Sequence, residues 1–257
     1  MPRKARKNYN SNFFHVMVQG INREYVFNTE ENKEKYKEII IKHMENNIQN
    51  ILNILSYCIM SNHTHFLFYC ENFEDLSHMM HQINLSFSRY YNKINNRVGY
   101  VFRDRFKVQE IMDINQLYNC LRYIHNNPVK AKMCDTMSDY KYSSFNEFLG
   151  KREIINDNSI ELLFGRSDNY QEMLKMIHQN LKSDEFIDVN DMNIKEFSNN
   201  FCDDNMTSIK DIKENAAMLE KFIKHAKRET TNTLADISDF LGVSLYKVGL
   251  LYRKKAK

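Results

Sequence analysis

Two histidines separated by one residue are the side chains of this chain best placed to do chemistry. His63 and His65 lie in a run of apolar and aromatic residues that is typical of a β-strand over 63–70. Alternate side chains on a strand leave the same face, so both imidazoles would project together, about 7 Å apart at their Cα atoms. They could converge on one metal ion or on one phosphate. Burying both without partners costs desolvation free energy, so we predict a metal site, with a pair of core histidines as the alternative.

A tyrosine and an asparagine near the end of a predicted helix could complete this site. Tyr123 and Asn127 are four residues apart and therefore share one helix face. A free phenol stays protonated at neutral pH, so a tyrosine nucleophile would need a phosphate polarised by a divalent cation. The amide of Asn127 would be the third ligand beside the two histidines, leaving positions open for phosphate oxygens. The alternative for Tyr123 is an ordinary half-buried tyrosine, because the chain has 15 of them.

The positive charge is clustered, although the formal net charge is only +3. Arg103, Arg105 and Lys107 alternate along a strand predicted over 100–111, so we expect them to share one face, as candidates for binding the phosphates of a nucleic-acid backbone. Their apolar neighbours on the opposite face are expected to pack in the core; these are Tyr100, Phe102 and Phe106. Two further clusters, over 3–7 and 253–257, either bind phosphates or are solvated ends.

The elements that must position these residues follow the order β-α-β-β-α-β and then a helix. The period of the apolar residues predicts strands over 13–19, 51–59, 63–70 and 100–111. It predicts helices from Asn28 or Thr29 to about 47 and over 73–94. A further helix is predicted over 115–126, where Pro128 would stop it. This order is that of the ferredoxin-like α+β fold, an antiparallel sheet with both helices on one face. The other face would be free for a ligand or another subunit.

The sequence indicates two more regions after the first domain. We divide the chain into a catalytic domain over 9–150, a polar helical connecting region over 151–230 and a DNA-binding segment over 231–257. In the last segment a helix ends at Gly242 and Ser244 can cap a second, basic helix. This pattern indicates a helix-turn-helix that contacts DNA through Lys247, Arg253 and Lys254, with a plain helical hairpin as the alternative.

Composition excludes several other classes of protein. Hydrophobic residues make up 42% of the 257 residues, enough for a sizeable core. The five cysteines form no CxxC pair, which favours a reducing, cytoplasmic compartment. The chain has no apolar run of 18 residues and no apolar signal core at its N-terminus, so we expect no membrane association.

Several ordered motifs together resemble one family. The run Met60–Leu67 resembles the His-x-His strand of HUH endonucleases and in particular of single-tyrosine, IS200-like transposases. The segments Phe102–Lys107, Tyr123–Ala131 and Asp139–Ser144 are similar to the REP-associated tyrosine transposase branch, and His15–Arg23 fits the family's first strand. The resemblance covers about residues 9–150.

This resemblance implies a DNA-nicking and strand-transfer enzyme that acts on single-stranded or hairpin DNA, often as a homodimer in which the tyrosine helix can complete the partner's site. Tyr123 would attack the phosphorus and keep the 5′-phosphate, while His63, His65 and Asn127 would hold Mg²⁺ or Mn²⁺. Imidazole ligands suit softer metals than Mg²⁺, so Mn²⁺ would serve at least as well. Tyr118 is a rival nucleophile, but its fourth neighbour, Arg122, is a poor metal ligand.

Two other functions remain open at the level of sequence. A catalytically silent, domesticated DNA-binding protein would keep the fold without the chemistry. A metal-dependent hydrolase would need a carboxylate base near the metal, and the core motifs provide none in a compelling position.

Overall fold

A computed structural model describes residues 9–45, 52–179, 194–230 and 232–253 of the chain. The chain divides into two compact units, Met1–Phe186 and Ile187–Lys257. Each unit has its own hydrophobic core. The expected connecting region 151–230 is therefore not a separate part, because its first residues pack in the first unit and its later helices pack in the second.

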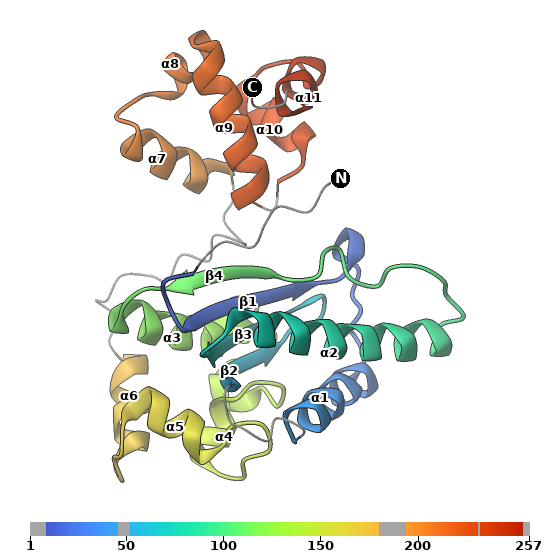
Figure 1. Cartoon of the computed structure of the whole chain (residues 1–257), viewed down its shortest axis with the longest axis vertical. Coiled ribbons are helices and arrows are strands. Elements are labelled where there is room, and N and C mark those ends of the chain that lie inside the picture. Colours follow the sequence, from blue (N-terminus) through green and yellow to red (C-terminus); the bar gives the residue numbers. More distant parts are fainter. Residues whose placement is uncertain (1–8, 46–51, 180–193, 231, 254–257) are drawn as a thin grey trace. The chain divides into compact units, whose positions relative to one another are not determined.

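The first unit is built on a four-stranded antiparallel sheet (Figure 1). Its strands are β1 (Phe13–Gln19), β2 (Leu52–Ile59), β3 (His63–Cys70) and β4 (Lys107–Ile111). They are ordered β2-β3-β1-β4, and every neighbouring pair is antiparallel. The bounds of β1 and β3 are those predicted from the sequence, because an apolar run bounded by polar residues marks both ends of each strand.

Two helices cover one face of this sheet, as expected. They are α1 (Glu30–Glu45) and α2 (Phe73–Ile94). The N-terminus of α1 is capped by Thr29, whose Oγ1 accepts from the amide of Asn32 at 3.2 Å. The two helices meet where the Tyr36 hydroxyl donates to Asn84 Oδ1 at 3.1 Å. The ring of Tyr36 packs against Phe66 of β3, so Phe66 points toward these helices.

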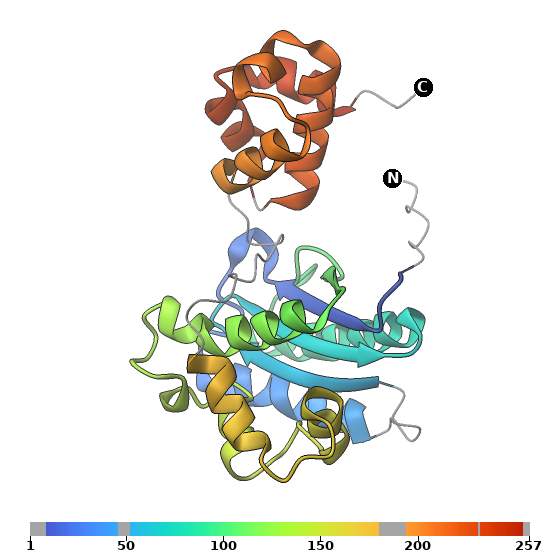
Figure 2. The ribbon, with the colours of Figure 1, turned by 90° about the vertical axis from the view of Figure 1, so that its left-hand side faces the viewer.

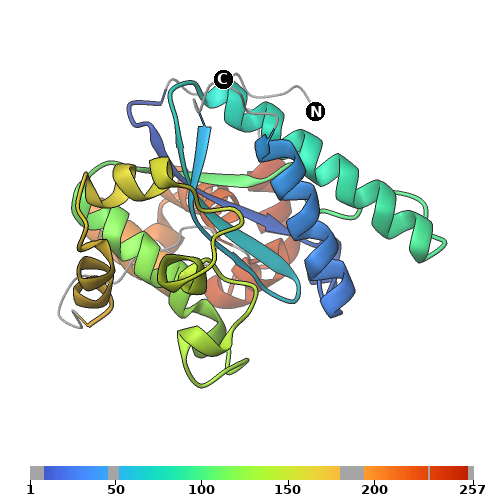
Figure 3. The same ribbon diagram turned by 90° about the horizontal axis from the view of Figure 1, so that it is seen from below.

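The opposite face is not free, which corrects the expectation from the sequence. Figure 3 shows the sheet between α1 and α2 on one side and a second group of helices on the other. This second group is α3 (Ile114–Lys130), α4 (Phe145–Leu149), α5 (Asp157–Phe164) and α6 (Tyr170–Gln179). Both α3 and α5 pack on β2, and α6 packs on α3. Apolar residues after 150, in α5 and α6, supply part of this cover together with α3 and α4, although the sequence predicts no packing role for that region. Figure 2 shows the same cover from another side.

The predicted fourth strand is shorter than expected. Only residues Lys107–Ile111 pair with β1 along a ladder, and the preceding segment 99–105 makes a single bridge between Phe102 and Gly20. Phe102 is buried and Phe106 packs partly against the core, as expected, but Tyr100 is 84% exposed and does not pack there. Arg103 and Arg105 therefore do not alternate along a strand with Lys107.

Pro128 lies inside α3 rather than ending it. The helix continues for two more residues and closes when the Ala131 amide donates to Asn127 O at 2.9 Å. A proline in the last turn removes one backbone donor, and few turns remain for its ring to disturb. Consequently Asn127 is a helical residue on the same face as Tyr123. Two short 3₁₀ turns complete the unit, η1 (Ile21–Arg23) and η2 (Met137–Asp139).

The second unit is helical over its described residues. It contains α7 (Ile194–Asp204), α8 (Ile209–Glu214), α9 (Ala216–Glu229), α10 (Leu234–Leu241) and α11 (Leu245–Arg253). The turn after α10 contains Gly242 at φ 61°, a left-handed conformation that glycine adopts without a Cβ penalty. The next helix begins after Ser244, whose Oγ accepts from the amide of Lys247.

Within the described residues, none of the helices has both the length and the apolar character needed to span a bilayer.

Candidate active site

Strand register places the two histidines beside polar and apolar residues of β1. His65 lies opposite Met17, and His63 lies opposite Gln19. Directly paired residues of antiparallel strands point to the same face, so all four side chains project toward α3 rather than toward α1 and α2. The prediction that His63 and His65 share one face is confirmed by this register.

A third histidine belongs to the same cluster. His15 Nε2 lies 3.0 Å from His65 Nδ1, and the two rings are stacked with planes 11° apart. Both side chains are fully buried. With Nδ1 of His65 engaged by His15, metal binding at His65 would use Nε2. Sequence reasoning gave His15 no role, because the register that brings β1 beside β3 is not encoded in the spacing of either strand.

The ring of His63 is oriented by its neighbour in the chain. His63 Nδ1 lies 2.6 Å from Asn62 Oδ1. An amide oxygen only accepts, so Nδ1 carries the proton and the lone pair of a neutral ring is on Nε2. The His63 ring is perpendicular to that of His65, with centroids 4.7 Å apart. Both histidines therefore have one nitrogen held by a neighbour, which is the usual arrangement of metal-binding histidines.

Tyr123 of α3 lies against this cluster. Its ring meets the rings of His65 and His15 edge-on, with centroids 5.4 Å and 5.9 Å away. Lys130 Nζ lies 5.8 Å from the centroid of the same ring. The rival tyrosine faces elsewhere: the Tyr118 hydroxyl donates to the carbonyl of Leu163 at 3.1 Å, and burial raises its pKa. The structure thus brings Tyr123, and not Tyr118, to the histidines.

Two buried amide side chains, of Asn127 and Gln19, are candidate oxygen donors for a metal ion at this site. Asn127 Nδ2 and Gln19 Oε1 are both buried and, among the described residues, have no hydrogen-bond partner. Carbonyl oxygens of amides are ligands for hard divalent ions, and Gln19 is placed beside His63 by the register. Within the described residues no three His, Cys, Asp or Glu side chains could hold a metal together. A metal held here would have to use two imidazoles with amide oxygens, completed by water or phosphate.

The basic residues divide between two places in the first unit. Lys107 pairs with Met17 across β1, so it lies on the histidine face, two strands from His65 and about 10 Å away. Arg103 and Arg105 lie in the segment before β4 and border a cavity next to α2. The expectation that all three share one face is therefore wrong, because the chain leaves the sheet before Lys107.

The basic residues expected in the second unit are on α11. Lys247 and Arg253 are exposed there, whereas Lys254 lies outside the described residues. The same helix also exposes Leu245, Tyr246 and Leu250, with only Val248 fully buried. This helix consequently presents a surface of basic, aromatic and apolar side chains.

A sheet with two adjacent strand histidines and a helix tyrosine against them has the groups needed for phosphodiester chemistry. Residues 8–127 match the family model described as "Transposase IS200 like". This part of the chain is therefore similar to the IS200-like transposases.

The curated proteins contain no match. Among solved structures, the chain is similar to "Structure of the REP associates tyrosine transposase bound to a REP hairpin", with a TM-score of 0.48 and 18% sequence identity. The similarity covers 59% of this chain and 87% of that chain.

Proposed function

We propose that this protein nicks and rejoins single-stranded or hairpin DNA through a covalent bond to Tyr123. The observation that carries the proposal is the position of the Tyr123 ring, which meets both His65 and His15 edge-on across the same face of the sheet. A nucleophile beside the groups that would bind the scissile phosphate is the arrangement that such chemistry needs.

The reaction exchanges one phosphodiester for another. The Tyr123 oxygen forms a bond to phosphorus, the bond from phosphorus to the 3′-oxygen breaks, and the phenol proton passes to solvent while the 3′-oxygen takes up a proton. The DNA 5′-phosphate stays on the tyrosine until a 3′-hydroxyl reverses the step. The charge of Lys130 near the ring supports negative charge on the phenol oxygen. No external energy source is required, because the two esters are similar.

His63, His65 and Asn127 would hold Mg²⁺ or Mn²⁺, and Gln19 is a fourth candidate ligand that the register adds. The ion when bound acts as a Lewis acid on the scissile phosphate. His15 does not need to touch the ion. Its contact with His65 fixes the tautomer and the orientation of that ring, which is the role of a positioning residue.

Further contacts would hold the DNA. Lys107 lies on the histidine face and is suited to a phosphate next to the scissile one. The turn 242–244 and the basic, exposed surface of α11 support a helix-turn-helix that binds DNA, with Lys247 and Arg253 among its contacts. In the first unit, the strand order β2-β3-β1-β4, with α1 and α2 on one face, supports a ferredoxin-like classification.

One assay tests the proposal. The protein is incubated with labelled hairpin DNA that has single-stranded flanks, with Mn²⁺, and then denatured. The expected result is a denaturant-resistant protein–DNA adduct. Hydrolysis without an adduct would point to a metal-dependent hydrolase, and binding without any cleavage would point to a silent DNA-binding protein. The homodimer stays a prediction, which sedimentation with and without the hairpin tests.

A further inference from the structure

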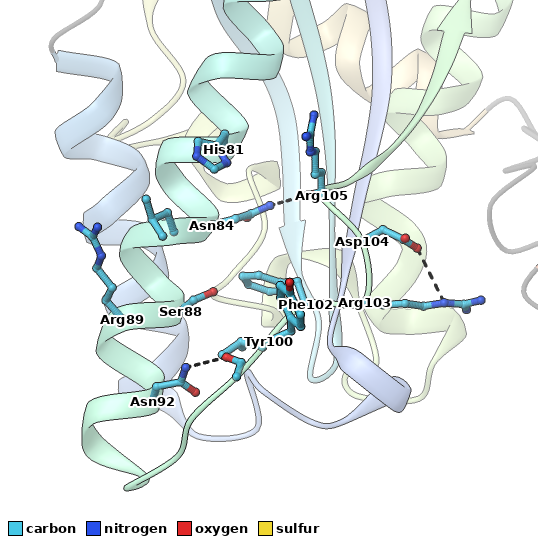
Figure 4. A pocket seen from close by; sticks show the side chains of 13 residues that line it. His81, Asn84, Ser88, Arg89, Asn92, Tyr100, Phe102, Arg103, Asp104 and Arg105 are labelled. Carbon is cyan, nitrogen blue, oxygen red and sulfur yellow. Dashed lines mark hydrogen bonds and ion pairs between the residues drawn. The ribbon is translucent and has the colours of Figure 1, made fainter. Parts of the chain in front are cut away.

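A cavity of about 570 Å³ lies beside α2, apart from the histidine cluster (Figure 4). Its wall on the helix is a stripe of residues at helical spacing, all polar except Leu85; they are His81, Asn84, Leu85, Ser88, Arg89 and Asn92. Its other wall is the segment 99–105. The volume falls in the range of roughly 300–1,000 Å³ that is usual for small-ligand sites.

The cavity has fixed walls. Asn84 Nδ2 donates to Arg105 O at 2.7 Å, and Asn92 Nδ2 donates to Gly99 O at 2.9 Å. These two amides are eight residues apart, so they hold the ends of the segment about 12 Å apart along the helix. On its other side the segment is tied to the end of β1, where the Arg103 amide donates to Gln19 O at 2.9 Å. The cavity between α2 and the segment 99–105 is therefore held open by hydrogen bonds to the backbone of the segment.

The lining favours an anionic ligand with a flat ring. Three arginines, Arg89, Arg103 and Arg105, are among the residues that line the cavity, together with one acidic residue, Asp104. Asp104 lies 3.8 Å from Arg103, which leaves Arg89 and Arg105 as the cations away from it. Tyr100 borders the same space with 84% of its surface exposed. An exposed aromatic ring among arginines is the combination that binds a base and its phosphates.

The wall of the cavity is linked through the backbone to the strand end beside His63. Gln19, which accepts from Arg103, is paired in register with His63, so the segment and His63 are separated by about two strand spacings, or about 10 Å. We propose that this cavity binds one unpaired nucleotide of the DNA substrate, with the base stacked on Tyr100 and the flanking phosphates held by Arg89 and Arg105. This inference rests on the proposed function, since it assumes that DNA is the substrate.

A fluorescence experiment without divalent metal tests this site separately from the chemistry. The probe is a hairpin oligonucleotide with single-stranded flanks, in which 2-aminopurine replaces each unpaired base in turn. The full chain is expected to quench the fluorescence at one flanking position. Tyr100→Ala should remove this quenching and weaken binding by roughly 5- to 150-fold, whereas Tyr100→Phe should preserve both because it keeps the ring.

A charge variant with a matched control completes the test. Arg89→Ala should lower the slope of log K against log salt by about 0.7, the value for one phosphate of a single strand. Arg166→Ala, which removes an exposed arginine outside the cavity, should leave the slope unchanged. Wild-type binding and quenching in Tyr100→Ala would overturn the inference even if adducts form. Conversely, quenching that depends on Tyr100 without any adduct would uphold this site and overturn the proposed chemistry.

Discussion

Two pairs of stacked histidines in the first unit have nearly the same internal geometry. In the first pair, His15 and His65 have nitrogens 3.0 Å apart, centroids 5.2 Å apart and planes at 11°. In the second pair, His125 and His178 have nitrogens 3.1 Å apart, centroids 5.2 Å apart and planes at 18°. The two pairs differ in the groups around them.

The second pair is a closed chain of hydrogen bonds. His178 Nδ1 donates to the carbonyl of Leu174 at 2.8 Å, so its Nε2 accepts from His125 Nδ1. His125 Nε2 then accepts from the hydroxyl of Ser144 at 2.8 Å and lies 3.1 Å from that of Ser56. Burial lowers the pKa of both imidazoles; His178 lowers the pKa of His125 further, and the charge of Arg122 lowers the pKa of His178. This pair joins α3, α6 and β2 as neutral rings.

The first pair instead has chemical groups on its borders, namely the ring of His63, the ring of Tyr123 and the amide of Gln19. A contact between two imidazoles therefore does not distinguish a structural pair from a reactive one. The distinction comes from what the surrounding side chains can do, and each of the following measurements would break or sharpen it.

The largest effect is expected from Tyr123→Phe. Removing the only atom that can form the ester should abolish the adduct, a loss of about a thousandfold or more. Tyr118→Phe is the matched control, because its hydroxyl is engaged by Leu163, and it should keep adduct formation. Adducts formed by Tyr123→Phe but not by Tyr118→Phe, measured on denaturing gels, would show that the nucleophile is assigned to the wrong tyrosine.

The next largest effect is expected from His65→Ala, which tests whether the two histidine pairs differ in function. We expect cleavage to fall by about 100-fold or more while binding of hairpin DNA stays within a few-fold, since affinity rests mainly on basic residues. His178→Gln, in the second pair, should cleave at close to the wild-type rate. Equal losses of activity in both variants would mean that the two pairs do not differ in function.

A smaller effect is expected from His15→Ala, which leaves both proposed histidine ligands in place. Loss of a residue that orients a metal ligand commonly weakens metal binding by about 10- to 100-fold. Electron paramagnetic resonance titration with Mn²⁺ measures this directly, without any reaction. An unchanged Mn²⁺ affinity, at a thermal stability equal to that of wild type, would contradict the positioning role.

The second pair predicts how stability depends on pH. Because burial lowers the folded-state pKa of His125 and His178, the unfolded chain binds more protons once the pH falls below about 6.5. Stability from this pair is therefore complete above that pH and is lost as the pH falls toward 5. Hydrogen exchange of α6 amides should rise over this range, and the rise should be smaller in His125→Gln. If His125→Gln shows the same rise in hydrogen exchange, the rise comes from the titration of groups other than this pair.

The smallest effect is expected from Lys107→Ala. One phosphate contact from an exposed edge strand should change the salt slope of single-stranded DNA binding by about 0.7 and leave the metal affinity unchanged. Glu110 lies on the same strand but on the opposite face, so Glu110→Ala serves as a positional control. A change in Mn²⁺ affinity in Lys107→Ala would place this lysine nearer the ligands than the register indicates.

Much of the site was predictable because it depends on local spacing. The period of two in β3 orients His63 and His65 together, and the period of 3.6 in α3 orients Tyr123 and Asn127 together. The sequence predicts a helical region after residue 150 but not its packing, because the apolar residues of these helices acquire a role only when they pack on β2 and α3. The alternating residues predict a strand over 100–111, but the carbonyls of Gly99 and Arg105 accept from side chains of α2, and the Arg103 amide donates to the end of β1.

The sequence by itself determined which side chains share a face within one element, because backbone geometry fixes side-chain direction over a few residues. Only the tertiary structure decided which faces meet. The register of β1 on β3 brought His15 and Gln19 to the histidines, and the docking of α3 on the sheet selected Tyr123 rather than Tyr118. These choices depend on packing between residues far apart in the chain, which spacing within an element does not record.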